Sequence, residues 1–412
     1  MMKTRFGHGK PALVGAAWPP MPIQSFVTHF RALNPAHMLT QPQTLAWLVE
    51  AHTRAEMTLA TRNGTQFEED RFRVRIAHAL ARFGCSADKI ATRGVELADG
   101  THTIWSDMQI FRLHEKPEGE GMSSRMRLYS EVAAGVFERF YAEEEEPPSD
   151  LLHVTCTGYV SPSAPQRLVS TRGWGRHTRV TQAYHMGCYA SLPALRIAGG
   201  FASAPGALRP VGPRRVDVVH TELCTLHLNP LIHTPEQIVV QTLFADGFIA
   251  YSVCDASARG GEPALQLLAL AEDVIPDSSE SMRWICSDWG MQMTLSRDVP
   301  ERLTAVLSPF IDQLCDRANL TSAERAEAQF AIHPGGPKIL DGVQALLDLR
   351  DEQIKHSRDV LLSRGNMSSA TLPHVWMNMM ADENVADGQI IISAAFGPGL
   401  TLCGAVMRKS MA

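Results

Sequence analysis

Three residues of the sequence have side chains suited to acyl transfer through a thiol. Cys188 follows a predicted strand and Gly187, and it opens a predicted helix, whose N-terminal amides and dipole favour a thiolate. His333 precedes a rigid Pro-Gly-Gly-Pro loop that can aim an imidazole, and Asn366 lies among small residues that let its amide project. Together they offer a nucleophile, a base and a hydrogen-bond donor. Each alone is more often structural: a buried cysteine, a loop histidine or a turn asparagine.

The segments around these residues alternate between predicted strands and helices. We expect a first strand at Pro11–Trp18, a mostly helical stretch over 25–83 and a helix over 126–141. Further strands are expected at 151–157, 180–184, 215–221, 248–254, just past residue 264, 389–394 and 400–407. Further helices are expected at 191–198, from residue 301, and after the loop at His333 up to residue 362. This alternation on both sides of a linker-like segment, 255–264, predicts a layered α/β fold in two halves.

Composition limits the class of protein. The chain has 412 residues, 45% of them apolar and 20% charged, so it can bury a large core without disulfides or structural metals. The net charge of −6 argues against nucleic-acid binding by bulk electrostatics. Eight scattered cysteines without a CxxC pair favour a reducing compartment. No signal peptide or apolar stretch of ~18 residues is found, so we expect a cytoplasmic protein without a membrane span.

Two other features have simpler interpretations. His220, Cys224, His227 and His233 lie close together in the sequence, and zinc accepts such ligands. Their spacing matches no common zinc motif, and a strand would point them to opposite faces, so we expect no metal site. The acidic run at 143–146 is followed by two prolines and is typical of a solvated loop.

The order of Cys188, His333 and Asn366, with HPGGPKILD at 333–341 and GNMSSAT at 365–371, resembles the type III polyketide synthases. This is the chalcone and stilbene synthase-like branch of the thiolase superfamily, and the resemblance is to its bacterial type. The other matching segments, in the family's order, are HVTCTGY at 153–159, HMGCYAS at 185–191, VVHTEL at 218–223, LFADG at 243–247, SRDVP at 296–300 and AFGPG at 395–399. The match is nearly continuous from Leu151 onward and weak before it. The HQAN motif of ketoacyl-ACP synthase III is absent.

The resemblance implies a five-layered αβαβα thiolase-like fold with two pseudo-duplicated halves. The half at 1–258 would carry the nucleophilic cysteine, and the half at 259–412 the histidine and asparagine. Cys188, held as a thiolate by His333, would take an acyl group from a thioester. His333 and Asn366 would stabilise the enolate formed when malonyl-CoA loses CO₂. No metal or redox cofactor is required.

The resemblance also marks residues that would surround the substrate. Phe244 matches the family's gatekeeper phenylalanine, and Met293 occupies the second gatekeeper position. Trp284 falls near a position that is small in the plant members. The other expected substrate contacts are Thr157, Cys224, His227, Ser368, Gly397, Pro398 and Gly399. Without the resemblance, Phe244 would be interpreted as a core aromatic residue.

Acyl-CoA and malonyl-CoA are the expected substrates, and the family implies a homodimer. Plant members carry several basic residues at the start of the CoA tunnel, whereas the comparable stretch here keeps at most Lys89 and Arg93. Arg172, Arg176 and Arg179 offer an alternative positive patch, although a solvated basic loop is the simpler interpretation. The starter donor is therefore either acyl-CoA or an acyl carrier protein.

The leading hypothesis is an iterative type III polyketide synthase. It would extend an acyl starter, with fatty acyl groups favoured, and cyclise the product to an alkylpyrone, alkylresorcinol or related polyketide. One alternative is a single-condensation ketosynthase, similar to ketoacyl-ACP synthase III, that joins acyl chains, possibly from a carrier protein. The others are a catalytically silent acyl-thioester-binding scaffold and a thioesterase-like hydrolase.

Overall fold

The computed structural model describes residues 25–203 and 214–411, and a nine-stranded mixed sheet runs through them. The strand order is β11-β12-β13-β8-β1-β7-β6-β4-β5, with β4 parallel to both β5 and β6, and β11 parallel to β12. The nine strands are β1 (Ser25–Leu33), β4 (Asp150–Thr155), β5 (Arg179–Tyr184), β6 (Arg215–Leu223), β7 (Asp246–Asp255), β8 (Ala264–Val274), β11 (Gln329–Ile332), β12 (Ile390–Gly397) and β13 (Thr401–Ser410).

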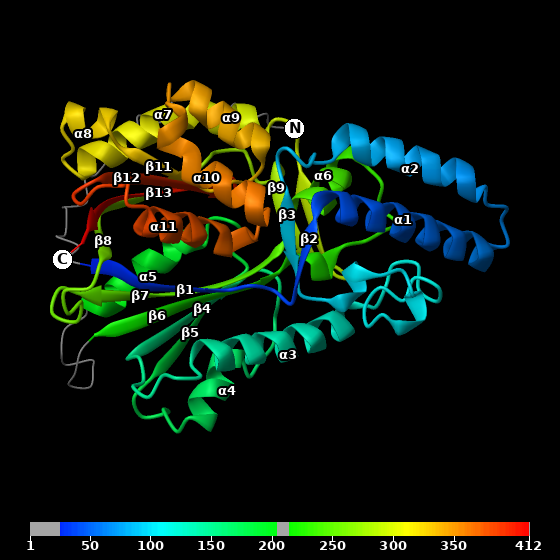
Figure 1. Ribbon diagram of the computed structural model, residues 1–412, viewed down its shortest axis with the longest axis horizontal. Helices are drawn as coiled ribbons and strands as arrows, with labels where there is room; N and C mark the ends of the chain where they lie inside the picture. The colour runs from blue at the N-terminus through cyan, green and yellow to red at the C-terminus, as the bar shows by residue number, and fades with distance from the viewer. Residues whose placement is uncertain (1–24, 204–213, 412) are drawn as a thin grey trace, which may run out of the picture.

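Helices and the two halves of this sheet form five layers (Figure 1). Helices α7 to α10 cover β11, β12, β13 and β8 on one outer side, and α3 and α4 cover the other half on the opposite side. Helices α5 and α11 lie between the two halves. Their bounds are α3 (Met122–Phe140), α4 (Ala164–Thr171), α5 (Ser191–Ser203), α7 (Val299–Arg317), α8 (Ser322–Ala326), α9 (Pro337–Leu346), α10 (Asp351–Arg364) and α11 (Thr371–Ala381). The predicted five-layered thiolase-like fold is confirmed.

A smaller group of elements projects from one end of the layers (Figure 1). It includes two antiparallel strand pairs, one of β2 with β3 and one of β9 with β10. The elements are β2 (His37–Thr40), α1 (Gln41–Asn63), α2 (Glu69–Phe83), β3 (Thr92–Val95), α6 (Pro235–Leu243), β9 (Met282–Cys286) and β10 (Met291–Leu295). Short 3₁₀ turns lie at 98–101, 105–107, 224–227 and 368–370.

Strand β1 corrects the prediction of a helical stretch from residue 25. It pairs antiparallel with β7 along most of its length and with β8 through Phe26 and Val27, so it joins the two halves of the sheet. Phe26, Val27 and Thr28 are aromatic or β-branched, and this central position overrides the helical periodicity. The predicted helices at 41–83 are present as α1 and α2. The strand predicted at Pro11–Trp18 lies outside the described residues.

Three apolar cores match the layers. The first lies between the two halves of the sheet, where Leu195 of α5 and Trp376 of α11 are fully buried. The second packs α1, α2 and α3 against one half, and the third packs α7, α9 and α10 against the other. Because α5 and α11 have buried residues on most of their length, the loops at their N-terminal ends are held rigidly. Both loops carry candidate catalytic residues.

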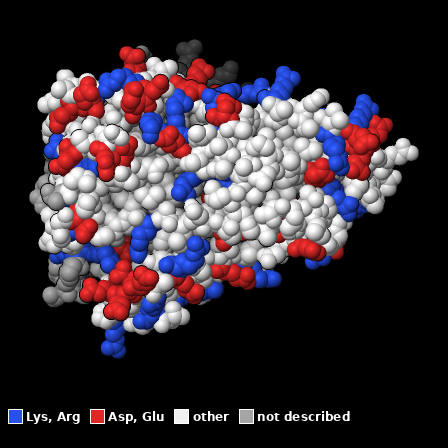
Figure 2. All heavy atoms as spheres, in the orientation of Figure 1, with Lys and Arg blue, Asp and Glu red and all other residues white. Residues whose placement is uncertain are grey.

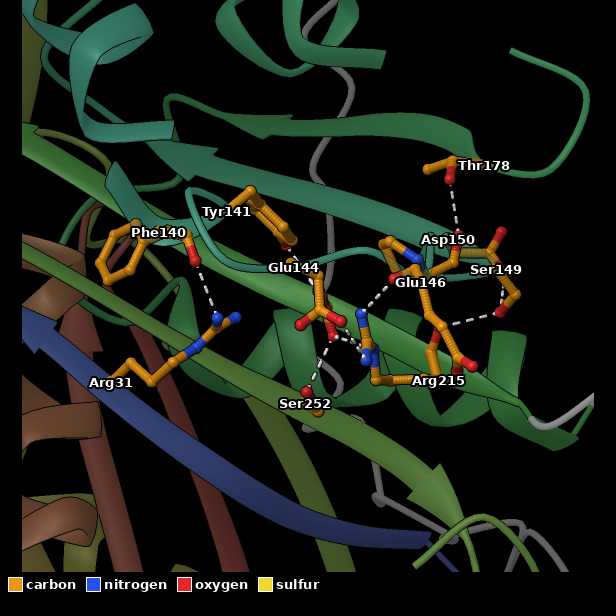
Figure 3. Close-up of polar contacts among 12 residues, drawn as sticks. Arg31, Phe140, Tyr141, Glu144, Glu146, Ser149, Asp150, Thr178, Arg215 and Ser252 are labelled. Atoms are coloured by element: carbon orange, nitrogen blue, oxygen red, sulfur yellow. Dashed lines mark hydrogen bonds and ion pairs between the residues drawn. The ribbon is translucent and has the colours of Figure 1, made fainter. Parts of the chain in front are cut away.

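The acidic run at 143–146 is a largely exposed loop, as predicted, and it is also anchored to the sheet. Arg215 on β6 forms an ion pair with Glu144 at 3.4 Å and donates to the carbonyl of Glu146 at 3.0 Å (Figure 3). The same arginine pairs with buried Asp217, which also accepts hydrogen bonds from Tyr141 and Ser252. The sheet therefore holds the chain between α3 and β4 through a charge network.

The boundary predicted at residue 258 falls in the turn between β7 and β8, and the sheet is continuous across it. The division into 1–258 and 259–412 stays a prediction. Among the described helices, none has the length and apolarity needed to cross a bilayer. On the face in Figure 2, acidic and basic side chains are intermixed, and few of either lie over α6, β2 and β3.

Candidate active site

Cys188 lies in the tight turn that joins β5 to α5. Gly187 has a φ of 83°, in the left-handed region that favours glycine, and the Ala190 amide donates to the Gly187 carbonyl at 3.1 Å. The turn ends three residues after Cys188, where α5 begins at Ser191. Cys188 is buried, with 7% of its surface exposed. The sequence prediction of a cysteine between a strand and a helix start is therefore met, although the cysteine precedes the first helical turn.

The predicted GPG loop packs directly against this turn. A Cβ at Gly187 would lie 2.8 Å from Cδ of Pro398, and a Cβ at Gly397 would lie 2.2 Å from the ring of Tyr189. Glycine at both positions lets the two backbones approach this closely. The loop after β12 thus fixes the backbone that carries Cys188.

Asn366 is held so that its amide group can donate toward the thiol. Its Oδ1 accepts the Ser368 amide at 2.9 Å and the Thr371 hydroxyl at 3.3 Å. A side-chain hydrogen bond from Asn366 stabilises the ionised form of Cys188. With Oδ1 occupied by two donors, the NH₂ group is the part of the amide left for the site.

Ser368 stands between two cysteines. Its hydroxyl lies 2.9 Å from the sulfur of Cys156 and 3.7 Å from that of Cys188. Buried Glu222 underlies this group, accepting hydrogen bonds from the Thr157 hydroxyl at 2.8 Å and the Cys156 amide at 3.1 Å. Sequence reasoning did not select Cys156 or Glu222, although both fall in the matching segments HVTCTGY and VVHTEL.

His333 follows β11, and its backbone amide donates to Ala394 on β12 at 2.8 Å. The imidazole is buried, yet neither ring nitrogen has a hydrogen-bond partner among the described residues. Buried polar groups are nearly always satisfied, so an orphaned imidazole indicates a place for a ligand. Its loop packs against the end of α6, since a Cβ at Gly336 would lie 3.8 Å from Leu243. The hydrogen bonds between described residues include none from His333 to Cys188.

Burial sets the charge of both groups. It raises the pKa of the Cys188 thiol to about 12, even though Ser368 and Asn366 favour the thiolate. Burial also lowers the pKa of His333 to about 3. Burial therefore favours the neutral thiol and the neutral imidazole over the charged pair, and the thiolate expected at Cys188 stays a prediction.

A largely apolar pocket opens above Cys188. It encloses about 1040 Å³ of space not filled by atoms, part of it open to solvent. Of the predicted substrate contacts, the pocket wall includes Thr157, Cys224, His227, Phe244, Met293, Ser368 and Pro398, together with Cys188 itself. Gly397 and Gly399, on either side of Pro398, are not among the described residues that line the pocket.

Two wall side chains are fixed by hydrogen bonds, and a third residue is placed by strand pairing. His227 accepts the Met291 amide at its Nδ1 at 3.1 Å, while its Nε2 donates to the Thr157 carbonyl at 2.8 Å. The Trp284 indole donates to the Cys156 carbonyl at 2.6 Å. Met293 lies opposite Trp284 in the β9–β10 hairpin, so one hairpin places both bulky side chains in the wall.

The alternative of a zinc site at His220, Cys224, His227 and His233 is not supported. In the described part of the chain, no three histidine, cysteine or acidic side chains are grouped to hold a metal ion. Instead, His220 contacts Ser369 at 3.0 Å, and His233 pairs with Glu56 at 3.0 Å. These histidines therefore belong to separate hydrogen-bond networks.

Comparisons with known proteins agree with this arrangement. The model of the chalcone and stilbene synthase C-terminal domain matches residues 266–411. Type III polyketide synthase C of Arabidopsis thaliana is 28% identical over 270 residues, which cover 64% of this chain and 68% of that protein. The 1,3,6,8-tetrahydroxynaphthalene synthase of Streptomyces griseus is 28% identical over 270 residues, covering 65% and 69%.

A longer relative and a solved structure extend the comparison. Probable polyketide synthase 1 of Dictyostelium discoideum is 29% identical over 263 residues, which cover 63% of this chain but 8% of that protein. The crystal structure of the C-terminal type III polyketide synthase domain of Steely1, from Dictyostelium, superposes with a TM-score of 0.77 at 22% identity. It covers 93% of this chain and 99% of the domain, which shows the shared fold.

The predicted restriction to a bacterial type is not supported, because similar proteins come from a plant, a bacterium and an amoeba. The broader prediction is confirmed. The chain has the fold of these enzymes, a matching C-terminal domain and homologues among them over about two thirds of its length. The chain is therefore similar in sequence and in fold to the type III polyketide synthases, and residues 266–411 match the chalcone and stilbene synthase C-terminal domain.

Proposed function

We propose that the chain loads an acyl group from a thioester onto Cys188 and extends it with malonyl-CoA. Neutral His333 takes the thiol proton as the sulfur attacks the thioester carbonyl. The carbon–sulfur bond to the donor breaks, and the departing thiolate takes that proton.

Extension follows at the acylated cysteine. Malonyl-CoA loses CO₂, and the electron pair of the broken carbon–carbon bond forms an enolate on the remaining thioester. N–H groups of Asn366 and His333 stabilise the enolate oxygen. The enolate carbon attacks the acyl–Cys188 carbonyl, a carbon–carbon bond forms, and the cysteine sulfur leaves and regains a proton. Reloading the longer chain repeats the cycle.

One observation carries this proposal. The buried His333 imidazole has no hydrogen-bond partner among the described residues, and Ser368 and Thr371 orient the Asn366 side chain with its NH₂ group toward Cys188. An unpaired imidazole in a buried site is costly unless a substrate oxygen satisfies it. A scaffold without catalytic activity would have no reason to retain it.

A medium or long acyl starter fits the pocket best. Beyond Phe244, its walls are mainly apolar, and they include Leu39, Trp47, Leu48, Val95, Leu97 and Phe111. Each methylene buried there contributes about 0.8 kcal/mol. Cyclisation to an alkylpyrone or alkylresorcinol is the outcome that we propose for such a starter.

The test is to incubate the purified protein with malonyl-CoA and acyl-CoAs of two to sixteen carbons. Mass spectrometry should find an acyl adduct on Cys188 and products longer by ketide units. Matched acyl carrier protein thioesters distinguish the two donors. Free acid without a new carbon–carbon bond would refute the synthase and support a hydrolase. Absence of both adduct and decarboxylation would favour a silent scaffold.

A single condensation is the second candidate, favoured by Trp284. Its indole is fixed by Cys156, and its ring packs at 5.8 Å against that of His227, so it occupies pocket volume that a growing chain would need. Products extended by one ketide unit from every starter would support this candidate. Trp284→Ala should then lengthen the products, and Trp284→Phe provides the matched control.

We also propose a homodimer in the cytoplasm. The edge strand β5 has neighbours on one side only among the described strands, and all but one of its residues are half-buried or exposed, so a second copy can pair there. All eight cysteines are free, which agrees with a reducing compartment. Sedimentation of the wild type and a Thr181→Pro variant, whose proline removes a donor from this strand, tests the assembly.

A further inference from the structure

The C-terminal end of α6 carries the gate of the pocket. Phe244 directly follows the last helical residue, Leu243, and lines the pocket. Near its other end, Gln237 donates to the carbonyl of Met293 at 2.6 Å. Both gatekeeper positions therefore depend on where this one short helix lies.

The last carbonyls of α6 are satisfied by groups from other elements. The Gln41 side chain of α1 donates to the carbonyl of Thr242 at 2.9 Å, and the backbone N–H of Asn366 donates to the carbonyl of Leu243 at 3.0 Å. The two remaining carbonyls, of Gln241 and Phe244, accept from the same Nη1 of Arg93 at 2.9 and 2.6 Å. A cation at this position also complements the helix dipole.

Arg93 is an unusual residue for this position, because it is buried on β3 with 2% of its surface exposed. Its Nη1 is committed to the two carbonyls, and its nearest acidic partner is buried Asp246. Its Nη1 is therefore not free to act as a mobile surface cation, although Arg93 also lines the pocket. The assignment of Arg93 to a phosphate-binding stretch stays a prediction.

The same segment is tied to the candidate oxyanion donor. Phe244 and Asn366 form a parallel β-bridge. In it, the backbone N–H of Ala245 donates to the backbone carbonyl of Asn366 at 2.8 Å, and the backbone N–H of Asn366 donates to the carbonyl of Leu243. A shift of the Phe244 backbone therefore moves the backbone of Asn366 as well. Removing the Arg93 donors would leave two buried carbonyls unpaired at this junction.

We propose that Arg93 is a positioning residue that sets the gate at Phe244 and, through the Phe244–Asn366 bridge, the aim of the Asn366 amide. This inference rests on the proposed function. The role predicts a change in which starters are accepted, whereas a purely structural role would lower the active fraction equally for all starters.

The experiment compares Arg93→Met, Arg93→Lys and the wild type. Arg93→Met keeps the length of the side chain without donors, and Arg93→Lys keeps the charge and a single ammonium. Arg71→Met is the matched control, since the Arg71 side chain is 85% exposed. For each protein, kcat/KM is measured with starters of two and twelve carbons, and active enzyme is counted by alkylation of Cys188. The ratio of the two kcat/KM values does not depend on the folded fraction.

We expect Arg93→Met to change this ratio by about tenfold, a typical effect of altered pocket contacts. Decarboxylation of malonyl-CoA per active site should fall in the same variant. Arg93→Lys should lie between Arg93→Met and the wild type, and it carries the test if the methionine variant does not fold. The inference is overturned if both variants fold and keep the wild-type ratio of kcat/KM values. It is also overturned if only Arg93→Lys folds and keeps that ratio. Absence of wild-type products would refute the proposed function itself.

Discussion

The oxyanion role of Asn366 makes the sharpest prediction. Asn366→Ala removes one N–H donor from the site while Cys188 keeps its contact with Ser368 at 3.7 Å. Loss of one such donor costs about 3 kcal/mol of transition-state stabilisation, so decarboxylation of malonyl-CoA should fall at least about 100-fold. Acyl loading of Cys188 should persist, because that step uses the thiol and His333. The assays are CO₂ release and intact-protein mass spectrometry.

A graded series separates orientation from deletion. Thr371→Val removes a hydroxyl that lies 3.3 Å from Asn366 Oδ1, donates to the Ser368 carbonyl at 2.8 Å and accepts the Met367 amide at 2.8 Å, and a hydrogen bond contributes about 1 kcal/mol. We therefore expect a decrease of about fivefold, and Thr371→Ser, which keeps the hydroxyl, should behave as wild type. If Asn366→Ala decarboxylates malonyl-CoA within about threefold of the wild-type rate, the assignment of Asn366 as a donor is refuted.

Three further predictions concern the turn, the thiol and the core. Gly187→Ala combines a left-handed φ with a contact of 2.8 Å between the new Cβ and Pro398. Acylation of Cys188 should therefore slow more than in the control Gly173→Ala, where φ is 68° but the space around the residue is open. Equal acylation rates in the two variants would contradict a role for the contact with Pro398. Because burial raises the pKa of Cys188 to about 12, its alkylation by iodoacetamide should keep rising between about pH 6 and pH 9, and a plateau below pH 7 would instead indicate an ion pair. Leu195→Ala, in the core between the sheet halves, should lower the free energy of unfolding by about 2–5 kcal/mol, measured by urea denaturation, whereas Leu346→Ala at 39% exposure should change it much less.

Much of the fold followed from local patterns in the sequence. The apolar, β-branched runs that became β4, β6, β7, β12 and β13 are buried strands, and such runs carry a strong strand signal. Strand β1 was missed because its identity depends on neighbours more than 200 residues away, which no local window contains. The Cys-His-Asn candidates were found through spacing and the matching segments around them.

The supporting residues of the site were less accessible to sequence reasoning. Arg93 looked like a surface cation, because nothing local indicates that a guanidinium on a four-residue strand will be buried under the end of α6. Glu222 and Cys156 became visible only when β4 and β6 lay side by side. The neutral state of Cys188 and His333 depends on burial, which is a property of the packed structure.

The central place of β1 also bears on how the chain is made. Val27 pairs with Val253 on β7, and Phe26 pairs with Gln266 on β8. During synthesis, β1 therefore leaves the ribosome long before the strands with which it pairs. Sheets built from such distant pairings form slowly, since loop closure precedes any gain from contacts. Until β7 and β8 emerge, both edges of β1 stay open to other chains. A chaperone that shields β1 should therefore raise the yield of folded enzyme, and slower translation of residues 246–274 should lower it.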